Sequence, residues 1–253
     1  MRLFRTMQET ILEIRRDLFK SPVLTSTRVQ NQIGERTVRE ALGYTYSIPV
    51  QEIPYEPVDL ASLGAQYFPY WNAHESDIRD WMEAQRRERL HPFGWGERDL
   101  STSSADLLHP ELVKMKEGSH YAYTYEERLL GMWESMAQAL RQNPDTRRAY
   151  WPIYQPLDAL RAAEMTRIPC SLGYHFLIRE QPLMGHRLHV VYLQRSANFQ
   201  IFWLSDLWFA SQILHSMVRR LRQSGDPGDL KPGVVTHTIT SFHSFFDEEA
   251  EIF

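Results

Sequence analysis

The sequence contains a single cysteine, Cys170, and no long apolar run. One thiol excludes an intrachain disulfide and most cysteine-rich metal sites, and it favours a reducing compartment, which we expect to be the cytoplasm. No segment reaches the ~18–20 apolar residues of a membrane-spanning helix. The amino terminus, MRLFRTMQETILEIRRDLF, also lacks the apolar centre of a signal peptide. We therefore predict a protein without a membrane segment.

The charges are close to balanced. The chain carries 28 basic and 32 acidic side chains, for a net charge of −4, which disfavours a general surface for nucleic acid or anionic membranes. An apolar share of 43% with 24% charged residues is ordinary for a folded protein. With 253 residues and no repeat or low-complexity linker, residues 1–253 are predicted to form a single domain.

Hydrophobic periodicity predicts a mixed order of helices and strands. Spacings of three and four residues predict helices, whereas alternation predicts strands. Residues 51–118 hold five prolines and a polar tract, and we expect an irregular, divergent region with one or two helices. The predicted helices cover 3–20, 126–142 and 207–222, and the predicted strands cover 37–50, 148–155, 172–179, 187–194 and 234–245. Strands and helices that do not alternate regularly predict the α+β class, with helices packed on one large sheet.

Cys170 is the first candidate for chemistry. It follows Pro169 at the entry to a predicted strand, and Arg167 lies close in sequence. Free cysteine is often an inert, buried residue. A neighbouring guanidinium would instead favour the thiolate, which is the nucleophilic form. The sequence leaves both interpretations open.

Two basic clusters are candidates for phosphate binding. Arg147 and Arg148 follow the helix stop at Asn143-Pro144-Asp145, and Arg195 stands between Gln194 and Ser196 at a strand end. The guanidinium fork matches phosphate oxygens, and a serine hydroxyl adds a donor. The alternative is that these arginines are solvated surface residues.

Asp206, His237 and His243 complete the polar candidates. Asp206 is either the N-cap of the helix that follows it or a carboxylate that accepts a hydrogen bond from the amine of cytosine. Alternation along 234–245 places His237 and His243 on one strand face. Further metal ligands are missing, so no metal is predicted; a hydrogen bond from His243 to a sugar hydroxyl is the preferred interpretation.

These segments, in this order, resemble the thymidylate synthase and deoxycytidylate hydroxymethylase superfamily. Asn143-Pro144-Asp145-Thr146-Arg147-Arg148 is similar to its NPDSRR motif, Pro169-Cys170 to its catalytic PC, and Leu193-Gln194-Arg195-Ser196 to its YQRS. Lys231-Pro232-Gly233 and Ser241-Phe242-His243-Ser244-Phe245 are similar to its PG…HIY stretch, and Ser119-His120-Tyr121-Ala122 to its YG element. The resemblance covers roughly residues 119–245.

The resemblance implies a three-layer α+β fold, a homodimer, and one-carbon transfer to carbon 5 of a pyrimidine nucleotide. It implies that the Cys170 thiolate adds to carbon 6 and that 5,10-methylenetetrahydrofolate supplies the methylene group. Arg195 and Ser196 would bind the phosphate, with Arg147 and Arg148 reaching in from the partner. His243 would contact the ribose.

The resemblance also suggests which base is bound. The synthases that act on deoxyuridylate have asparagine at the position of Asp206, whereas the cytidylate hydroxymethylases have aspartate. The expected activity is therefore 5-hydroxymethylation of dCMP or CMP, and a divergent thymidylate synthase acting on dUMP is the alternative. Asn198 would also face the base, and Tyr121 and Gln194 would complete the pocket.

Several residues depart from the family pattern. Asn198 stands where the family usually has aspartate, Phe202 falls at or beside a customary glycine of the folate cleft, and Phe245 replaces a tyrosine. Glu83 is the nearest candidate for the general acid. These departures, with a short acidic end after the last predicted strand, leave two further alternatives. One is a nucleotide-binding homologue with altered or lost folate chemistry, and the other is an α+β protein in which Cys170 is merely buried.

Overall fold

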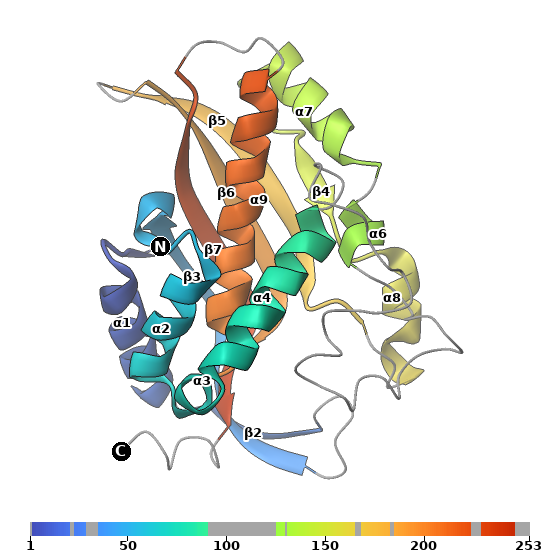
Figure 1. Cartoon of the computed structure of the whole chain (residues 1–253). Coiled ribbons are helices and arrows are strands. Elements are labelled where there is room, and N and C mark those ends of the chain that lie inside the picture. Colours follow the sequence, from blue (N-terminus) through green and yellow to red (C-terminus); the bar gives the residue numbers. More distant parts are fainter. Residues whose placement is uncertain are drawn as a thin grey trace.

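The fold is given by a computed structural model, which describes residues 2–20, 23–28, 35–90, 125–129, 131–164, 168–182, 185–223 and 229–245 (Figure 1). The strands are β1 (Arg2–Leu3), β2 (Val23–Arg28), β3 (Glu35–Pro49), β4 (Tyr150–Pro152), β5 (Ser171–Gln181), β6 (Gly185–Asn198) and β7 (Lys231–Phe245). The helices are α1 (Met7–Lys20), α2 (Pro57–Tyr67), α3 (Pro69–Ala73), α4 (Glu75–Leu90), α6 (Tyr125–Leu129), α7 (Trp133–Gln142), α8 (Pro156–Leu160) and α9 (Trp203–Gln223), with 3-10 turns at Val50–Glu52 and Arg161–Glu164.

The described strands form one mixed sheet. Its order is β1-β3-β7-β6-β5-β4, and β2 pairs with β3 outside this path. β6 and β7 are parallel, as are β1 and β3, whereas β3–β7, β5–β6 and β4–β5 are antiparallel. The parallel pair needs a crossover connection, and α9 supplies it. The mixed sheet with helices confirms the α+β class.

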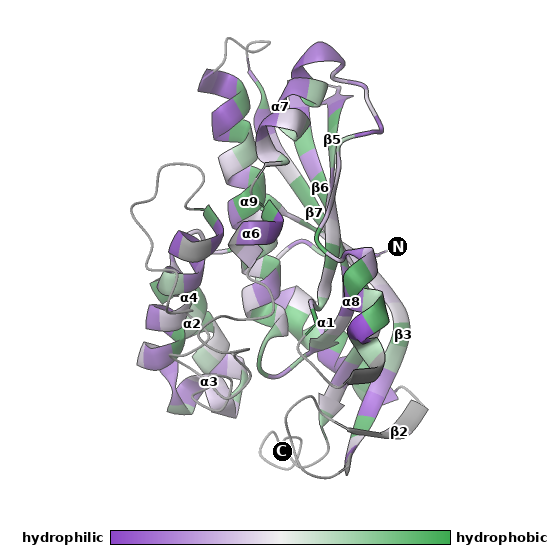
Figure 2. Ribbon diagram, turned by 90° about the vertical axis from the view of Figure 1, so that its right-hand side faces the viewer, coloured by the Kyte–Doolittle hydropathy of each residue, from purple (hydrophilic) through white to green (hydrophobic). Residues whose placement is uncertain are grey.

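Helices cover one face of this sheet. α9 packs on β6 and β7, α1 packs on β3, and α4 packs against α9 (Figure 1). α1 buries its apolar stripe, including Met7, Ile11, Ile14 and Leu18, while α9 is buried on almost every side. In Figure 2, α4 and α9 lie to the left of β5, β6 and β7. None of the helices in the described ranges is long and apolar enough to span a membrane.

The alternation of buried residues changes phase along neighbouring strands. In β7, Val235, His237 and Ile239 are buried, but the next buried residues are Phe242 and Ser244. A similar change occurs in β6 after Gln194, and the β5–β6 register shifts between Ser171 and Gly173. A bulge bends a strand and redirects the side chains that follow. The sheet is therefore irregular along a line across β5, β6 and β7.

This phase change corrects one expectation about β7. Tyr46 lies opposite His237 in the register, and Trp203 packs against both Tyr46 and Phe242. His237 and Phe242 thus lie on the same face of β7, toward Trp203 of α9. His243, which follows Phe242, points away from it. The prediction that His237 and His243 share a face is wrong, because strict alternation does not hold across the irregular segment.

The region 51–90 is more regular than predicted. α2, α3 and α4 follow one another with short connections, and residues 91–118 lie outside the described residues. Pro57 and Pro69 occupy the first turns of α2 and α3. Proline at this position lacks only an N–H that has no partner in the helix, so it begins a helix rather than breaking one. The prediction of an irregular region treated these two prolines as helix breakers, whereas both begin a helix.

Two other helix predictions also need correction. The predicted helix 126–142 is two helices, α6 and α7, because Gly131 between them has a φ of 80°, which a helix cannot contain. The predicted helix 207–222 begins four residues earlier, at Trp203. Asp206 is therefore inside the first turn of α9 and is not its N-cap.

Candidate functional site

The sheet topology brings the main candidates to one end of the sheet. Because β6 and β7 are parallel, their carboxyl ends lie together, and Asn198 pairs with His243. β5 is antiparallel to β6, so its amino end, next to Cys170, meets the same end of β6, where Ser171 pairs with Gln194. The connection from β6 into α9 then places Asp206 above these strand ends.

Cys170 contacts Arg195. The Nη2 atom of Arg195 lies 3.7 Å from the Sγ atom of Cys170, and the backbone N–H of Arg195 donates to the Cys170 carbonyl at 2.7 Å. Arg195 Nε also reaches the Pro169 carbonyl at 3.4 Å. Cys170 is partly accessible rather than fully buried. A guanidinium beside a sulfur favours the thiolate form. Arg167, the neighbour considered from the sequence, lies outside the described residues.

Asp206 is joined to a chain of buried hydrogen bonds. Gln194 Nε2 donates to Asp206 Oδ2 at 2.6 Å, and Gln194 Oε1 accepts from His237 Nε2 at 2.8 Å. His237 Nδ1 lies 3.0 Å from the Tyr46 hydroxyl, which accepts from Trp203 Nε1 at 2.9 Å. The amide oxygen can only accept, so His237 carries its proton on Nε2 and the Tyr46 hydroxyl donates to Nδ1. Each donor in this series of hydrogen bonds, from Trp203 to Gln194, therefore has one acceptor.

Burial sets the protonation of this chain. Burial raises the pKa of Asp206 to about 6, although the charge of Arg89 and the hydrogen bond from Gln194 oppose the rise. Burial lowers the pKa of His237 to about 3, so this imidazole is neutral at physiological pH. Asp206 is mostly ionised at neutral pH. Among the residues joined by these hydrogen bonds, only Asp206 is therefore charged at neutral pH.

Tyrosine hydroxyls lie close to Ser171, the residue after Cys170. Ser171 Oγ lies 2.7 Å from the Tyr192 hydroxyl and 3.4 Å from the Tyr125 hydroxyl. The Tyr174 and Tyr192 rings are stacked, with centroids 4.8 Å apart, and Tyr192 stacks on His237 at 4.6 Å. Burial raises the pKa of Tyr125, so its hydroxyl keeps its proton at neutral pH. Of these tyrosines, Tyr125 also interacts electrostatically with Cys170.

His243, Ser196 and Asn198 lie at the same end of the sheet. Ser196 pairs with Ser241 in the register, and His243 contacts the Phe245 ring at a centroid distance of 5.2 Å. Burial lowers the pKa of His243, so it is neutral at pH 7. Asn198 Oδ1 accepts from the backbone N–H groups of residues 200 and 201 at 2.8 and 3.1 Å. That oxygen supports the turn before α9.

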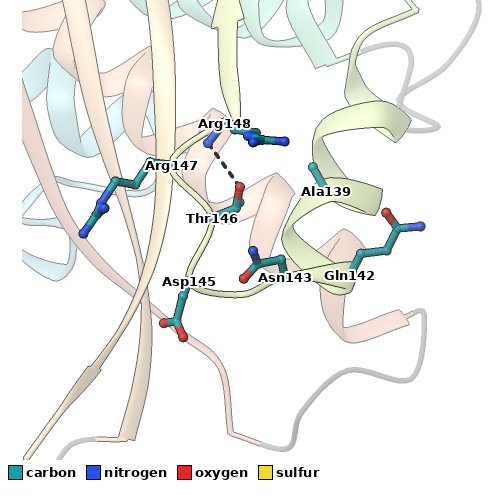
Figure 3. Close-up of a pocket in the computed structure, with 7 residues that line it drawn as sticks. All are labelled: Ala139, Gln142, Asn143, Asp145, Thr146, Arg147 and Arg148. Carbon is teal, nitrogen blue, oxygen red and sulfur yellow. Dashed lines mark hydrogen bonds between the residues drawn. The ribbon is translucent and has the colours of Figure 1, made fainter.

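Arg147 and Arg148 lie elsewhere on the chain. They precede β4, whose Tyr150 pairs with His175, five residues along β5 from Cys170. Five extended residues span about 17 Å. Both arginines line an open hollow of about 530 Å³ together with the end of α7 (Figure 3). Figure 3 shows the Arg147 side chain directed away from α7. The structure does not bring these arginines to the Cys170 of the same chain.

Glu83 is engaged in ion pairs within its own helix. The Glu83 carboxylate pairs with Arg86 at 2.7 Å and with Arg87 at 3.3 Å on the same helix, α4. Tyr121 lies outside the described residues. The predicted roles of both residues stay predictions.

Sequence reasoning missed Arg89. This residue is 5% exposed and lies on the buried face of α4 with Ile78, Met82 and Gln85. The spacing of these four positions is four, three and four, which is that of an apolar helix stripe. The sequence signal for Arg89 was that an arginine and a glutamine occupy positions of this otherwise apolar stripe. Tyr125 and Tyr46 gave no comparable signal, because aromatic residues are common in cores.

No metal centre is evident in this part of the molecule. Within the residues that the structure describes, no group of three or more His, Cys, Asp or Glu side chains could hold a metal ion. Comparison of the sequence with known protein families and with curated proteins finds no match. The evidence on function is therefore the arrangement around Cys170, Arg195 and Asp206.

Proposed function

We propose that the protein is a pyrimidine nucleotide 5-hydroxymethylase that acts on dCMP or CMP, with a thymidylate synthase-like three-layer fold and a cytoplasmic location. The observation that carries the proposal is the contact between Cys170 and Arg195 beside the Gln194–Asp206 hydrogen bond. It places a thiol, a guanidinium and a carboxylate at one end of the sheet, although they come from separate segments. These groups match a nucleophile, a phosphate ligand and a base ligand.

The chemistry assigned to the chain is covalent. The Cys170 thiolate forms a bond to carbon 6, and the electron pair displaced onto carbon 5 makes that carbon nucleophilic. Once a bound donor has supplied the one-carbon unit, carbon 5 would lose its hydrogen to water as a proton. Hydroxide from water would then add to the exocyclic methylene group and release a proton, and cleavage of the carbon–sulfur bond would restore the double bond between carbons 5 and 6 and the thiolate. Asp206 accepts a hydrogen bond from the exocyclic amine and fixes the ring above the sulfur. Arg195 and Ser196 bind the phosphate, and His243 contacts the sugar.

The proposed homodimer completes the phosphate site. Arg147 and Arg148 are exposed and lie away from the Cys170 of their own chain. The half-buried residues Leu177, Val191 and Leu193 alternate with buried residues along β5 and β6, so they lie on the sheet face opposite α9. Pairing of this face with that of a second copy would bury these residues. Arg147 and Arg148 of that copy would then supply further cationic donors.

The proposed one-carbon donor is 5,10-methylenetetrahydrofolate, which would supply the methylene group. Two observations disagree with a folate site of the family's usual form. The Phe202 ring, at or beside the customary glycine, packs against Trp81 at a centroid distance of 6.2 Å. Asn198 Oδ1 is already used by the backbone N–H groups of the turn before α9. The residues at these two positions therefore do not fit a folate site of that form.

Release of tritium tests the proposal directly. The protein is incubated with 5-tritiated dCMP or CMP and methylenetetrahydrofolate, and tritium in water is counted. We expect release from a cytosine nucleotide with the native protein and none with Cys170→Ala. No release from either nucleotide would refute the hydroxymethylase. Conversion of dUMP to dTMP instead would identify a divergent thymidylate synthase.

A second candidate is a nucleotide-binding homologue without transfer chemistry. The packing of Phe202 against Trp81 and the engaged oxygen of Asn198 favour it over an intact folate enzyme. For such a protein, Cys170→Ala leaves the affinity for CMP unchanged, and the native protein releases no tritium. Calorimetric titration with CMP, run beside the tritium assay, distinguishes the two candidates.

A further inference from the structure

Arg89 is a buried cation whose binding capacity is incompletely used. Its guanidinium carbon lies 4.0 Å from the Tyr125 ring centroid and 3.9 Å from that of Phe209. Nε donates to Gln85 Oε1 at 3.0 Å. Nη1 is buried and has no hydrogen-bond partner among the residues that the structure describes. Buried donors without a partner are rare and costly, so this N–H group points to an acceptor on a ligand.

Arg89 belongs to the group around Asp206. It packs on Phe209, which lies one helical turn after Asp206 in α9, and its charge opposes the rise in the pKa of Asp206 and of Tyr174. Tyr125, against which it packs, reaches Ser171, the residue after Cys170. A cation from α4 and a carboxylate from α9 are therefore presented to the same site.

The base edge of cytosine needs both groups. Its exocyclic amine donates, whereas ring nitrogen N3 and the O2 carbonyl accept. An ionised Asp206 can only accept, so it binds the amine and repels N3. Gln194 Nε2 already donates to Asp206 at 2.6 Å. A separate donor is required for N3, and the Nη1 atom of Arg89 is a donor in this cluster that no described residue accepts from.

We propose that Arg89 is a specificity-determining residue that donates a hydrogen bond from Nη1 to ring nitrogen N3 of cytosine, while Asp206 accepts from the exocyclic amine. This inference rests on the proposed function, because it assumes a pyrimidine nucleotide above Cys170. Uracil is rejected at both positions. Its N3–H group meets the N–H of Arg89, and its O4 carbonyl meets the carboxylate of Asp206.

A cycle of two proteins and two ligands tests the contact. The native protein and Arg89→Met are titrated by calorimetry with CMP and with 3-deaza-CMP, in which a C–H group replaces N3. The native protein should bind 3-deaza-CMP about 10-fold or more weakly than CMP. Arg89→Met should bind CMP weakly and should no longer distinguish the two ligands. Its preference for CMP over UMP should fall as well.

Arg87→Met is the matched control. Arg87 is on the same helix, but its side chain is 67% exposed and pairs with Glu83. This variant should bind CMP as the native protein does. If Arg89→Met does not fold, as judged by circular dichroism, Arg89→Lys replaces it, because lysine keeps the charge and lacks the planar fork.

The outcomes separate the inference from the proposed function. Equal binding of CMP and 3-deaza-CMP by the native protein overturns the N3 contact, whatever the variants do. The same penalty for 3-deaza-CMP with and without Arg89 overturns the role of Arg89 and leaves the hydroxymethylase standing. If the native protein binds no pyrimidine nucleotide, the proposed function fails and the inference fails with it.

Discussion

At the scale of single residues, Asp206 combines a carboxylate with a half-buried position at the start of α9. Most buried acids are either neutralised or paired with a cation. Asp206 has a hydrogen bond from Gln194 and the field of Arg89, yet burial still raises its pKa to about 6. The folded protein therefore holds a proton on Asp206 over a range of pH in which the unfolded chain has released it.

This difference predicts how stability depends on pH. A raised pKa means that the folded state binds more protons than the unfolded state between the unperturbed value of 3.8 and about 6. The free energy of unfolding should thus decrease as pH rises through this window and stay level above it. A shift of about two units corresponds to about 3 kcal/mol at most.

Urea unfolding at a series of pH values measures this effect. The difference between the native protein and Asp206→Asn isolates Asp206 from the other acids of the chain. The asparagine variant should lack the decrease between pH 4 and pH 6 that burial of the carboxyl group causes in the native protein, or show it much reduced. Parallel curves for the two proteins would show that Asp206 does not titrate with a raised pKa.

At the scale of elements, the packing of α2 against α3 supports the start of α9. A Cβ atom added at Gly64 in α2 would overlap Cε3 of the Trp71 indole in α3. Trp71 is 1% exposed, and its indole N–H donates to the Ile201 carbonyl at 3.0 Å. Ile201 is in the turn that leads into α9. Trp71 therefore has little freedom to move away.

Gly64→Ala is expected to destabilise the protein. Overpacking of a filled core usually costs about 1–3 kcal/mol, and the rigid indole places this variant at the upper end. Gln66→Ala is the control, because Gln66 is exposed on the same helix. Chemical denaturation of both variants measures the effect. Equal stabilities would mean that α2 and α3 separate without cost.

At the scale of the whole molecule, the proposed site requires two chains. The thiol of one chain and Arg147 and Arg148 of the other would act on the same nucleotide. Cys170→Ala lacks the nucleophile, and the double variant Arg147→Met with Arg148→Met lacks the donors from the partner. Each variant alone should be nearly inactive, for different reasons.

Mixing the two variants should restore activity. After exchange of subunits, half of the dimers are mixed, and each mixed dimer has one site with both an intact thiol and intact arginines. About one quarter of the native activity is then expected in the tritium assay. Mixing each variant with itself is the control. A mixture that stays inactive after proven exchange would place the arginines and the thiol in separate sites.

Several parts of the fold follow from local sequence. The apolar spacing of Met7, Ile11, Ile14 and Leu18 is enough to predict α1, and the stripe of α9 was predicted in the same way. The strand segments and the α+β class follow from alternation and element order. Cys170, Arg195 and Asp206 were found as candidates from their sequence context, because each stands at the end or start of an element. Local pattern is sufficient where side chains of one element decide its own conformation.

The tertiary structure decided which of these residues meet. Arg89 comes next to Asp206 because α4 packs on α9, and their separation of more than a hundred residues is invisible to a local pattern. The phase change in β7 separates His237 from His243, and it coincides with the change in the paired segment of β6. The sequence by itself determined the chemistry that the chain carries. The order of strands and the packing of helices decided where that chemistry is assembled, since contacts between distant segments depend on the whole sheet.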